Sequence, residues 1–186
     1  MNLEQQVVSL DLAKQLKELG VPQESLFYWV KGRMDYGYEG EWDIEESENW
    51  FIFDHVVNHT FRDFDFSPYV GSMGETDEEY LAWEKRKNEA IVKMKNDVCS
   101  SYTVAELGEM LPRHIDVYSD ADPVVSLNLY VSKWTNGWLV EYLSVGGIRF
   151  MIHAVEAQNE ADARAKMLIW LIENNYLDPK GLNERI

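Results

Sequence analysis

The chain has 186 residues, of which 46% are hydrophobic and 27% are charged, values typical of a globular protein that can bury a sizeable core. Its formal net charge of −16 would repel nucleic-acid phosphates and anionic lipids, which disfavours direct nucleic-acid binding and attachment to a membrane surface. Cys99 is the single cysteine, so no intramolecular disulfide can form, and the sequence shows neither a signal-peptide pattern nor a long apolar span. We therefore expect a cytoplasmic protein.

A short helix and a strand are the first elements expected along the chain. Ser9 is a suitable N-cap for a helix that reaches about Leu19, and Gly20 followed by Pro22 would end it. Aromatic and β-branched residues then crowd residues 26–30, which predicts a strand.

The acidity of the chain is concentrated in one stretch. Residues 35–84 hold fifteen Asp or Glu and one base, Arg62, so they carry −14 of the net −16. The overlapping segment 27–69 contains thirteen of the twenty-four aromatic residues, and a disordered acidic tail would lack such residues. We therefore expect an ordered, acidic, aromatic-rich insertion at residues 31–98.

Within this insertion, residues 50–57 are the best strand candidate and a helix is expected from 77 to about 96. Thr76 and Glu79 form a capping box that would start this helix. Its apolar residues at helical spacing predict a buried side made of Tyr80, Trp83, Ile91 and Met94.

Turn and capping signals organise the remainder of the chain. Thr103 and Glu106 form a second capping box, for a short helix that ends at Pro112. Asn136-Gly137 is a strong hairpin signal, and Gly146-Gly147 supplies a second tight turn. Together the two turns predict a three-stranded antiparallel meander over residues 124–134, 138–145 and 148–155.

The register of this meander predicts which of its faces is buried. Two-residue loops would place one apolar set on a shared face, which we expect to be core: Tyr130, Trp134, Leu139, Leu143, Val145, Ile148, Phe150, Ile152 and Ala154. The opposite face is also too apolar to be bare, and a final helix follows from about 159 to 174. The expected fold is one α+β domain over residues 1–186, a three-layer α/β/α sandwich around a mainly antiparallel sheet.

Three segments of the chain resemble a group of small uncharacterised proteins encoded by phages and prophages. They are SLDLAKQLKELG at 9–20 continuing into QESLFYW at 23–29, TVAELGEMLP at 103–112, and EADARAKMLIW at 160–170. The order of elements is similar, more weakly, to an α/β/α sandwich domain of some phage proteins. The resemblance implies a mobile-element origin and a bacterial cytoplasm, and it assigns no catalytic or binding residue.

Metal and nucleophile patterns are sparse. His55 and His59, followed by Asp63 and Asp65, form the one metal-like cluster, but Val56 stands where a zinc protease has its glutamate. Solvated histidines are the favoured interpretation. No Gly-x-Ser-x-Gly elbow or phosphate loop is present, so no cofactor is predicted.

Glu141 is a candidate general acid, because the predicted register places it on the apolar face beside Ile152. Loss of hydration there would raise the pKa of its carboxyl group. An edge position or a hydrogen bond to a helix cap would explain the same residue without catalysis.

Aromatic residues interleaved with carboxylates suit recognition of guanidinium groups, which both rings and anions attract. Packing of the rings in a small satellite core is the alternative. The residues predicted to bind a partner on this basis are Glu39, Glu41, Trp42, Asp43, Glu45, Glu46 and Trp50.

The favoured hypothesis is a non-enzymatic protein whose acidic aromatic insertion binds a basic protein surface, with imitation of DNA as a sharper version. The alternative is a small-molecule enzyme that uses Glu141, His153 or the His55 and His59 pair in a pocket. A third hypothesis is a structural part of a virion or an oligomeric scaffold.

Overall fold

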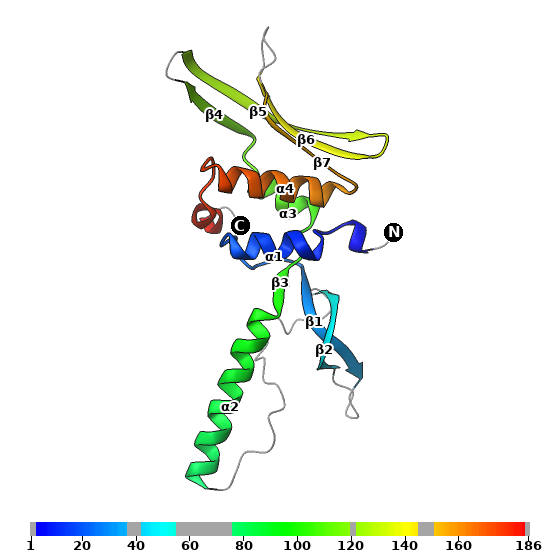
Figure 1. The fold of residues 1–186 in the computed structure, drawn as a ribbon, viewed down its shortest axis with the longest axis vertical. Helices are drawn as coiled ribbons and strands as arrows, with labels where there is room; N and C mark the ends of the chain where they lie inside the picture. Colours follow the sequence, from blue (N-terminus) through cyan, green and yellow to red (C-terminus); the bar gives the residue numbers. More distant parts are fainter. Residues whose placement is uncertain (1–2, 37–41, 55–75, 120–121, 145–150, 185–186) are drawn as a thin grey trace. The chain divides into compact units, whose positions relative to one another are not determined.

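The computed structural model describes residues 3–36, 42–54, 76–119, 122–144 and 151–184 (Figure 1). The chain is α+β, with two antiparallel sheets and four α-helices in the part described. It divides into two compact units: unit 1 comprises residues 1–27 and 100–186, and unit 2 comprises residues 28–99. The segment 31–98, predicted as an insertion, lies within unit 2.

Unit 1 is assembled from both ends of the chain. Its helical elements are η1 (Leu3–Gln5), α1 (Leu10–Glu18), α3 (Val104–Met110), α4 (Glu160–Glu173) and η2 (Pro179–Glu184). Its strands are β4 (His114–Ser119), β5 (Asp122–Trp134), β6 (Gly137–Ser144) and β7 (Met151–Ala157).

Capping interactions fix the starts of the helices in unit 1. Thr103 and Glu106 form the predicted capping box at α3, with the Thr103 hydroxyl accepting from the Glu106 amide. At α4 the Asn159 side chain accepts from the Asp162 amide at 2.7 Å. Ser9 occupies the N-cap position of α1, but its own amide donates to Asp162 Oδ1 at 2.8 Å. This bond ties the beginning of α1 to the first turn of α4, 153 residues along the chain.

The strands of unit 1 form one antiparallel sheet in the order β4-β5-β6-β7. Its last three strands are the predicted meander, and Trp134 pairs with Gly137 across a two-residue loop. β4 was not predicted. It pairs with β5 from His114, opposite Asn128, to Ser119, opposite Asp122. The expected turn at Gly146-Gly147 lies outside the described residues.

The two faces of this sheet differ sharply in burial. On the face that packs against α4, Leu127, Val140 and Tyr142 are completely buried, and the Tyr142 hydroxyl donates to the Pro112 carbonyl oxygen. We call it the helix face; by register it carries Ile115, Leu127, Leu129, Val131, Lys133, Trp138, Val140, Tyr142, Val155 and Ala157.

The opposite face, which we call the open face, was predicted to be the core. That prediction was wrong for Tyr130 and Trp134, while Val145, Ile148 and Phe150 lie outside the described residues. It carries His114, Asp116, Ser126, Asn128, Tyr130, Ser132, Trp134, Leu139, Glu141, Leu143, Met151, Ala154 and Glu156. Tyr130 and Trp134 are 43% and 60% exposed, although Leu139 on the central strand is buried. Because both faces of the meander are rich in apolar residues, alternation alone could not decide which of them α4 covers.

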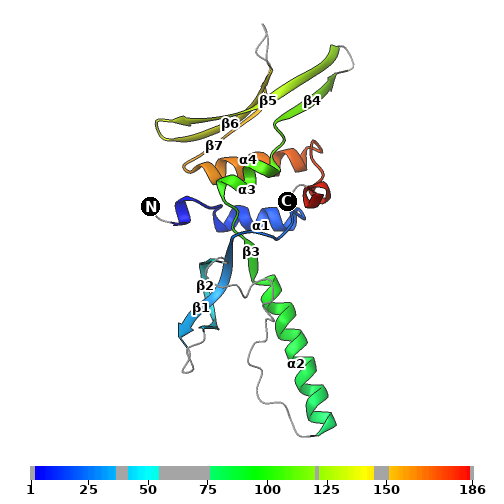
Figure 2. The same ribbon diagram turned by 180° about the vertical axis from the view of Figure 1, so that it is seen from behind.

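The helices of unit 1 all lie on one side of the sheet. Figures 1 and 2 show α3 and α4 next to the sheet and α1 beyond them. Most of the residues of α4 are therefore buried, and three alanines, Ala161, Ala163 and Ala165, occupy its first turns at 0% exposure. The second helical layer of the expected sandwich is not seen among the described residues of this unit, so the three-layer arrangement stays a prediction.

Unit 2 contains β1 (Phe27–Tyr36), which begins at the last residue of the N-terminal part of unit 1, together with β2 (Trp42–Asp54), α2 (Asp77–Asn96) and β3 (Val98–Ser100). The three strands form a sheet in the order β2-β1-β3, and the Lys31 amide donates to the Asp97 carbonyl oxygen at 2.9 Å. β2 includes the first part of the strand predicted at residues 50–57. α2 spans the predicted range, and the predicted capping box of Thr76 and Glu79 is present.

Candidate functional site

The first turns of α2 form a helix surface that is both acidic and aromatic. Tyr80 is 43% exposed and Leu81 is 62% exposed, so the prediction that Tyr80 is buried was wrong. The neighbouring acids Glu78, Glu79 and Glu84 are also exposed, and Trp83 is half-buried. We call these six residues the α2 surface.

The geometry of the α2 surface follows from its sequence. Tyr80 and Trp83 are three positions apart and therefore lie on neighbouring turns, with their ring centroids 6.0 Å apart. Leu81 follows Tyr80 directly, so it points to another side of the helix. Because the apolar residues 80–83 are consecutive, they spread around the helix and cannot all be covered by a single packing contact. This spacing was the available sequence signal for exposure, and the sequence prediction missed it.

β2 adds acidic groups to the same unit. The Glu48 side chain is 94% exposed, and its Oε2 lies 2.9 Å from Lys31 Nζ. Lys31 belongs to the adjacent strand β1, so this ion pair links two neighbouring strands. Such an exposed pair contributes little to stability.

The seven residues predicted to bind a partner are described only in part. Glu39 and Glu41 lie outside the described residues. Trp42, Asp43, Glu45 and Glu46 belong to β2, but the positions of their side chains also lie outside the description. Trp50 is half-buried in β2.

Glu141 and His153, the described residues of the enzymatic alternative, do not converge on one site. Glu141 is buried on β6, and its cross-strand neighbour is Ala154 rather than the predicted Ile152. The register already differs by one residue at Leu143, which pairs with Met151, and a bulge between Leu143 and Glu141 adds a second residue. His153 precedes Ala154 and therefore points to the other face of the sheet.

The remaining pair of that alternative, His55 and His59, lies outside the described residues. Among the residues that the structure does describe, no group of three or more His, Cys, Asp or Glu side chains could hold a metal ion.

His153 is part of an aromatic stack that joins β7 to α4. Its ring lies 4.3 Å from that of Trp170 at an interplanar angle of 7°, and Trp170 in turn stacks on Tyr176 at 5.4 Å. Loss of hydration in this stack lowers the pKa of His153 below its usual value. The neutral imidazole is thus favoured in the folded state.

This lowered pKa predicts a loss of stability in mild acid. His153 binds a proton more readily in the unfolded chain than in the folded one. Its contribution to the free energy of unfolding is therefore complete above about pH 6.5 and is lost as the pH falls toward the pKa of the folded state. The variant His153→Phe keeps a stacking ring but cannot titrate. In urea denaturation, we expect the unfolding midpoint of the natural chain to fall relative to that of His153→Phe when the pH is lowered from about 7 to about 5. A difference in midpoint that is the same at both pH values would contradict the lowered pKa of His153.

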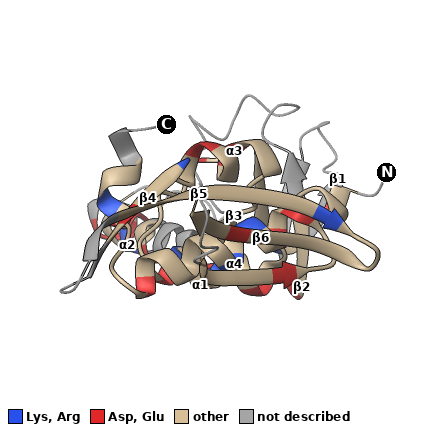
Figure 3. Cartoon of the chain, turned by 90° about the horizontal axis from the view of Figure 1, so that it is seen from above, with Lys and Arg blue, Asp and Glu red and all other residues tan. Residues whose placement is uncertain are grey.

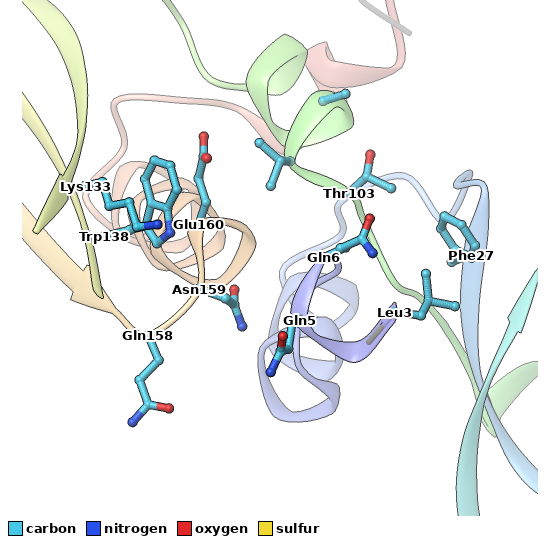
Figure 4. Close-up of a pocket in the computed structure, with 12 residues that line it drawn as sticks. Leu3, Gln5, Gln6, Phe27, Thr103, Lys133, Trp138, Gln158, Asn159 and Glu160 are labelled. Carbon is cyan, nitrogen blue, oxygen red and sulfur yellow. The ribbon is translucent and has the colours of Figure 1, made fainter. Parts of the chain in front are cut away.

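A cavity of about 660 Å³ lies within unit 1 (Figure 4). Trp138, Lys133 and Glu160 line one side of it, and Gln6 and Phe27 line the other. Its remaining lining residues are Leu3, Gln5, Thr103, Val104, Ala105, Gln158 and Asn159.

The polar groups of this cavity are largely engaged in structural contacts. Glu160 accepts from Arg164 Nη2 at 2.6 Å and from Nε at 2.9 Å, and Thr103 serves the cap of α3. Lys133 Nζ lies 5.9 Å from the ring centroid of Trp138, a weak cation–π contact. Among the described residues that line the cavity there is no His, Cys or Ser, and the hydroxyl of Thr103 is held by the Glu106 carboxylate in the cap of α3.

Comparisons with protein-family models, with curated proteins and with solved structures find no match to this chain. Among the described residues, no helix is both long enough and apolar enough to cross a membrane.

Proposed function

We propose that the chain is a non-enzymatic binding protein whose acidic, aromatic unit 2 contacts a basic surface of another protein. The proposal includes an origin in a phage or prophage and a cytoplasmic setting in a bacterial host. The observation that carries the binding proposal is the α2 surface, where Tyr80 and Leu81 stand exposed among three exposed carboxylates.

The energetics of the α2 surface favour a bound state. An exposed leucine and an exposed tyrosine on successive positions leave apolar area in water, and covering that area on binding would be favourable. A helix docks into a groove through the apolar side chains on its contacting side, and Tyr80 and Trp83, three positions apart, lie on one such side.

The charges select the kind of partner. Glu78, Glu79 and Glu84 surround the apolar residues, and residues 35–84 as a whole carry −14. A groove edged by Arg or Lys would complement this surface, since guanidinium groups pair with carboxylates and also stack on aromatic rings. An arrangement that imitates the charge of DNA is a sharper form of the same proposal.

The enzymatic alternative has less support. Glu141 and His153 lie on opposite faces of the sheet, and neither of them lines the cavity of unit 1. We therefore do not propose a catalytic role for them.

The test is recovery of a partner with the tagged full chain from a bacterial lysate, followed by affinity measurements with the purified partner. We expect Tyr80→Ala combined with Leu81→Ala to weaken binding by about tenfold or more, because two apolar contacts are lost. Alanine favours helix formation, so α2 itself is retained. The matched control is Leu26→Ala, which removes an exposed leucine from unit 1.

The electrostatic part has its own control. Glu78→Gln with Glu84→Gln should weaken binding and flatten its salt dependence between about 0.05 and 0.3 M, because the carboxylates attract the basic partner. Glu79 is left intact, since it caps α2. Glu109→Gln with Glu173→Gln changes the net charge equally in unit 1. An affinity that does not change with salt concentration would contradict the proposal. So would an equal loss of affinity in the variant of Glu78 and Glu84 and in the variant of Glu109 and Glu173.

A further inference from the structure

The open face of the unit 1 sheet exposes large apolar side chains. Among the described residues of the four strands, the exposed large hydrophobic side chains are Tyr130, Trp134 and Met151, and the register places all three on the open face. The helices of this unit pack on the other face (Figures 1 and 2). Exposed apolar residues gathered on one sheet face are typical of an interaction surface.

The described strand residues give this face acidic side chains and no Lys or Arg. The described strand residues contribute three carboxylates to it, from Asp116, Glu141 and Glu156. Lys133 is the single Lys or Arg in the four strands, and its pairing with Trp138 places it on the helix face. In Figure 3, which looks onto the sheet from its outer side, β5 and β6 are mostly uncharged.

We propose that the open face binds an amphipathic helix of a partner protein that carries arginine beside its apolar residues. Helices are the usual cover for a sheet face, because their apolar stripe matches the exposed side chains. Arginine suits this surface since it stacks on the rings of Tyr130 and Trp134 and also pairs with the carboxylates of Asp116 and Glu156. The partner helix would then supply in trans the second helical layer that the sequence predicted.

A second copy of the chain is a less suitable occupant. Docking of two open faces on each other would join surfaces on which the described strand residues carry the carboxylates of Asp116, Glu141 and Glu156 and no Lys or Arg. Bringing surfaces of like charge together is unfavourable. Charge complementarity therefore favours a cationic partner.

The test uses the full chain and a synthetic amphipathic peptide with leucines along one side and arginines beside them. Its counterpart has each arginine replaced by glutamate. Carboxyl labelling and oxidative labelling, read by mass spectrometry, report separately on Glu156 and Trp134 of the open face and on Glu84 and Tyr80 of α2. We expect the arginine peptide to protect Glu156 and Trp134, and the glutamate peptide to protect neither.

Variants then separate this site from diffuse attraction and from the α2 surface. Asp116→Asn with Glu156→Gln removes two exposed carboxylates and should weaken protection of Trp134 about fivefold. Glu109→Gln with Glu173→Gln, on helices of the same unit, should leave it unchanged. Tyr80→Ala with Leu81→Ala should also leave it unchanged, so failure of this site and failure of the proposed function are distinguishable.

Three results would overturn the proposal. Equal weakening of the protection of Trp134 in the variant of Asp116 and Glu156 and in the variant of Glu109 and Glu173 would show general charge attraction. Protection of Trp134 in the peptide-free monomer would show that the chain covers its own open face. Protection that rises with protein concentration, together with a dimeric mass, would show that a second copy occupies it.

Discussion

Leu168→Ala is expected to lower the free energy of unfolding of unit 1 by about 2–5 kcal/mol. Leu168 is completely buried in α4, and α4 contacts β6 and β7 on one side and α1 and α3 on the other. Removing three carbon atoms there forfeits their burial and also leaves a cavity, because helices held by a sheet and by other helices cannot simply close in. Urea denaturation of the natural chain and the variant measures the change.

The matched control for this variant is Leu26→Ala in the same unit. The Leu26 side chain is 47% exposed, so its truncation leaves no enclosed cavity and should change the free energy by less than about 1 kcal/mol. Similar losses for the two variants would mean that α4 is not the centre of the core.

Gly137→Ala is expected to destabilise unit 1 by about 3 kcal/mol. A Cβ atom at Gly137 would lie 2.3 Å from the Ala157 carbonyl oxygen and 3.2 Å from its carbon. Both atoms belong to the backbone of β7, so a side chain cannot move aside to relieve the clash. β6 and β7 would have to separate where Trp138 pairs with Ala157.

Gly181→Ala is the control for this second variant, since a Cβ there would meet no atom within 4 Å. Its stability should stay close to that of the natural chain. Amide hydrogen exchange locates the effect: Gly137→Ala should accelerate exchange at the end of β7 and leave α1 comparatively protected. Unchanged exchange at β7 would contradict the predicted clash.

Local signals in the sequence predicted most of the helices and strands. The capping boxes at Thr76 and Thr103 mark helix starts that the structure has, because each bonding pattern lies within four residues. The hairpin signal at Asn136-Gly137 is likewise local, although the two-residue loop in the structure is Thr135-Asn136 and Gly137 begins β6. These interactions need no knowledge of the tertiary structure.

What the sequence could not predict depends on long-range packing. The choice between the two faces of the meander required knowing where α4 lies, and the bulge near Glu141 shifted the register by an amount that no turn signal encodes. Tyr80 was expected to be buried because its spacing from Trp83 fits a helical stripe, yet no neighbouring element covers it enough to hide it.

For the candidate site, the sequence placed the acidic and aromatic residues in one segment but could not say which side chains are exposed. Composition predicted the character of unit 2, while the exposed pair of Tyr80 and Leu81 became apparent from the structure. Of the seven residues first favoured, the structure describes the side chain of Trp50 only.

The assembly of unit 1 from both ends of the chain has a consequence for biosynthesis. Val8 donates its amide to Tyr102, and Ser9 donates to Asp162, so these two residues leave the ribosome well before the partners to which they bond. Unit 2 emerges completely before those partners do. A nascent chain therefore presents its acidic unit early, and a product truncated before α4 would lack the helix around which the rest of unit 1 packs.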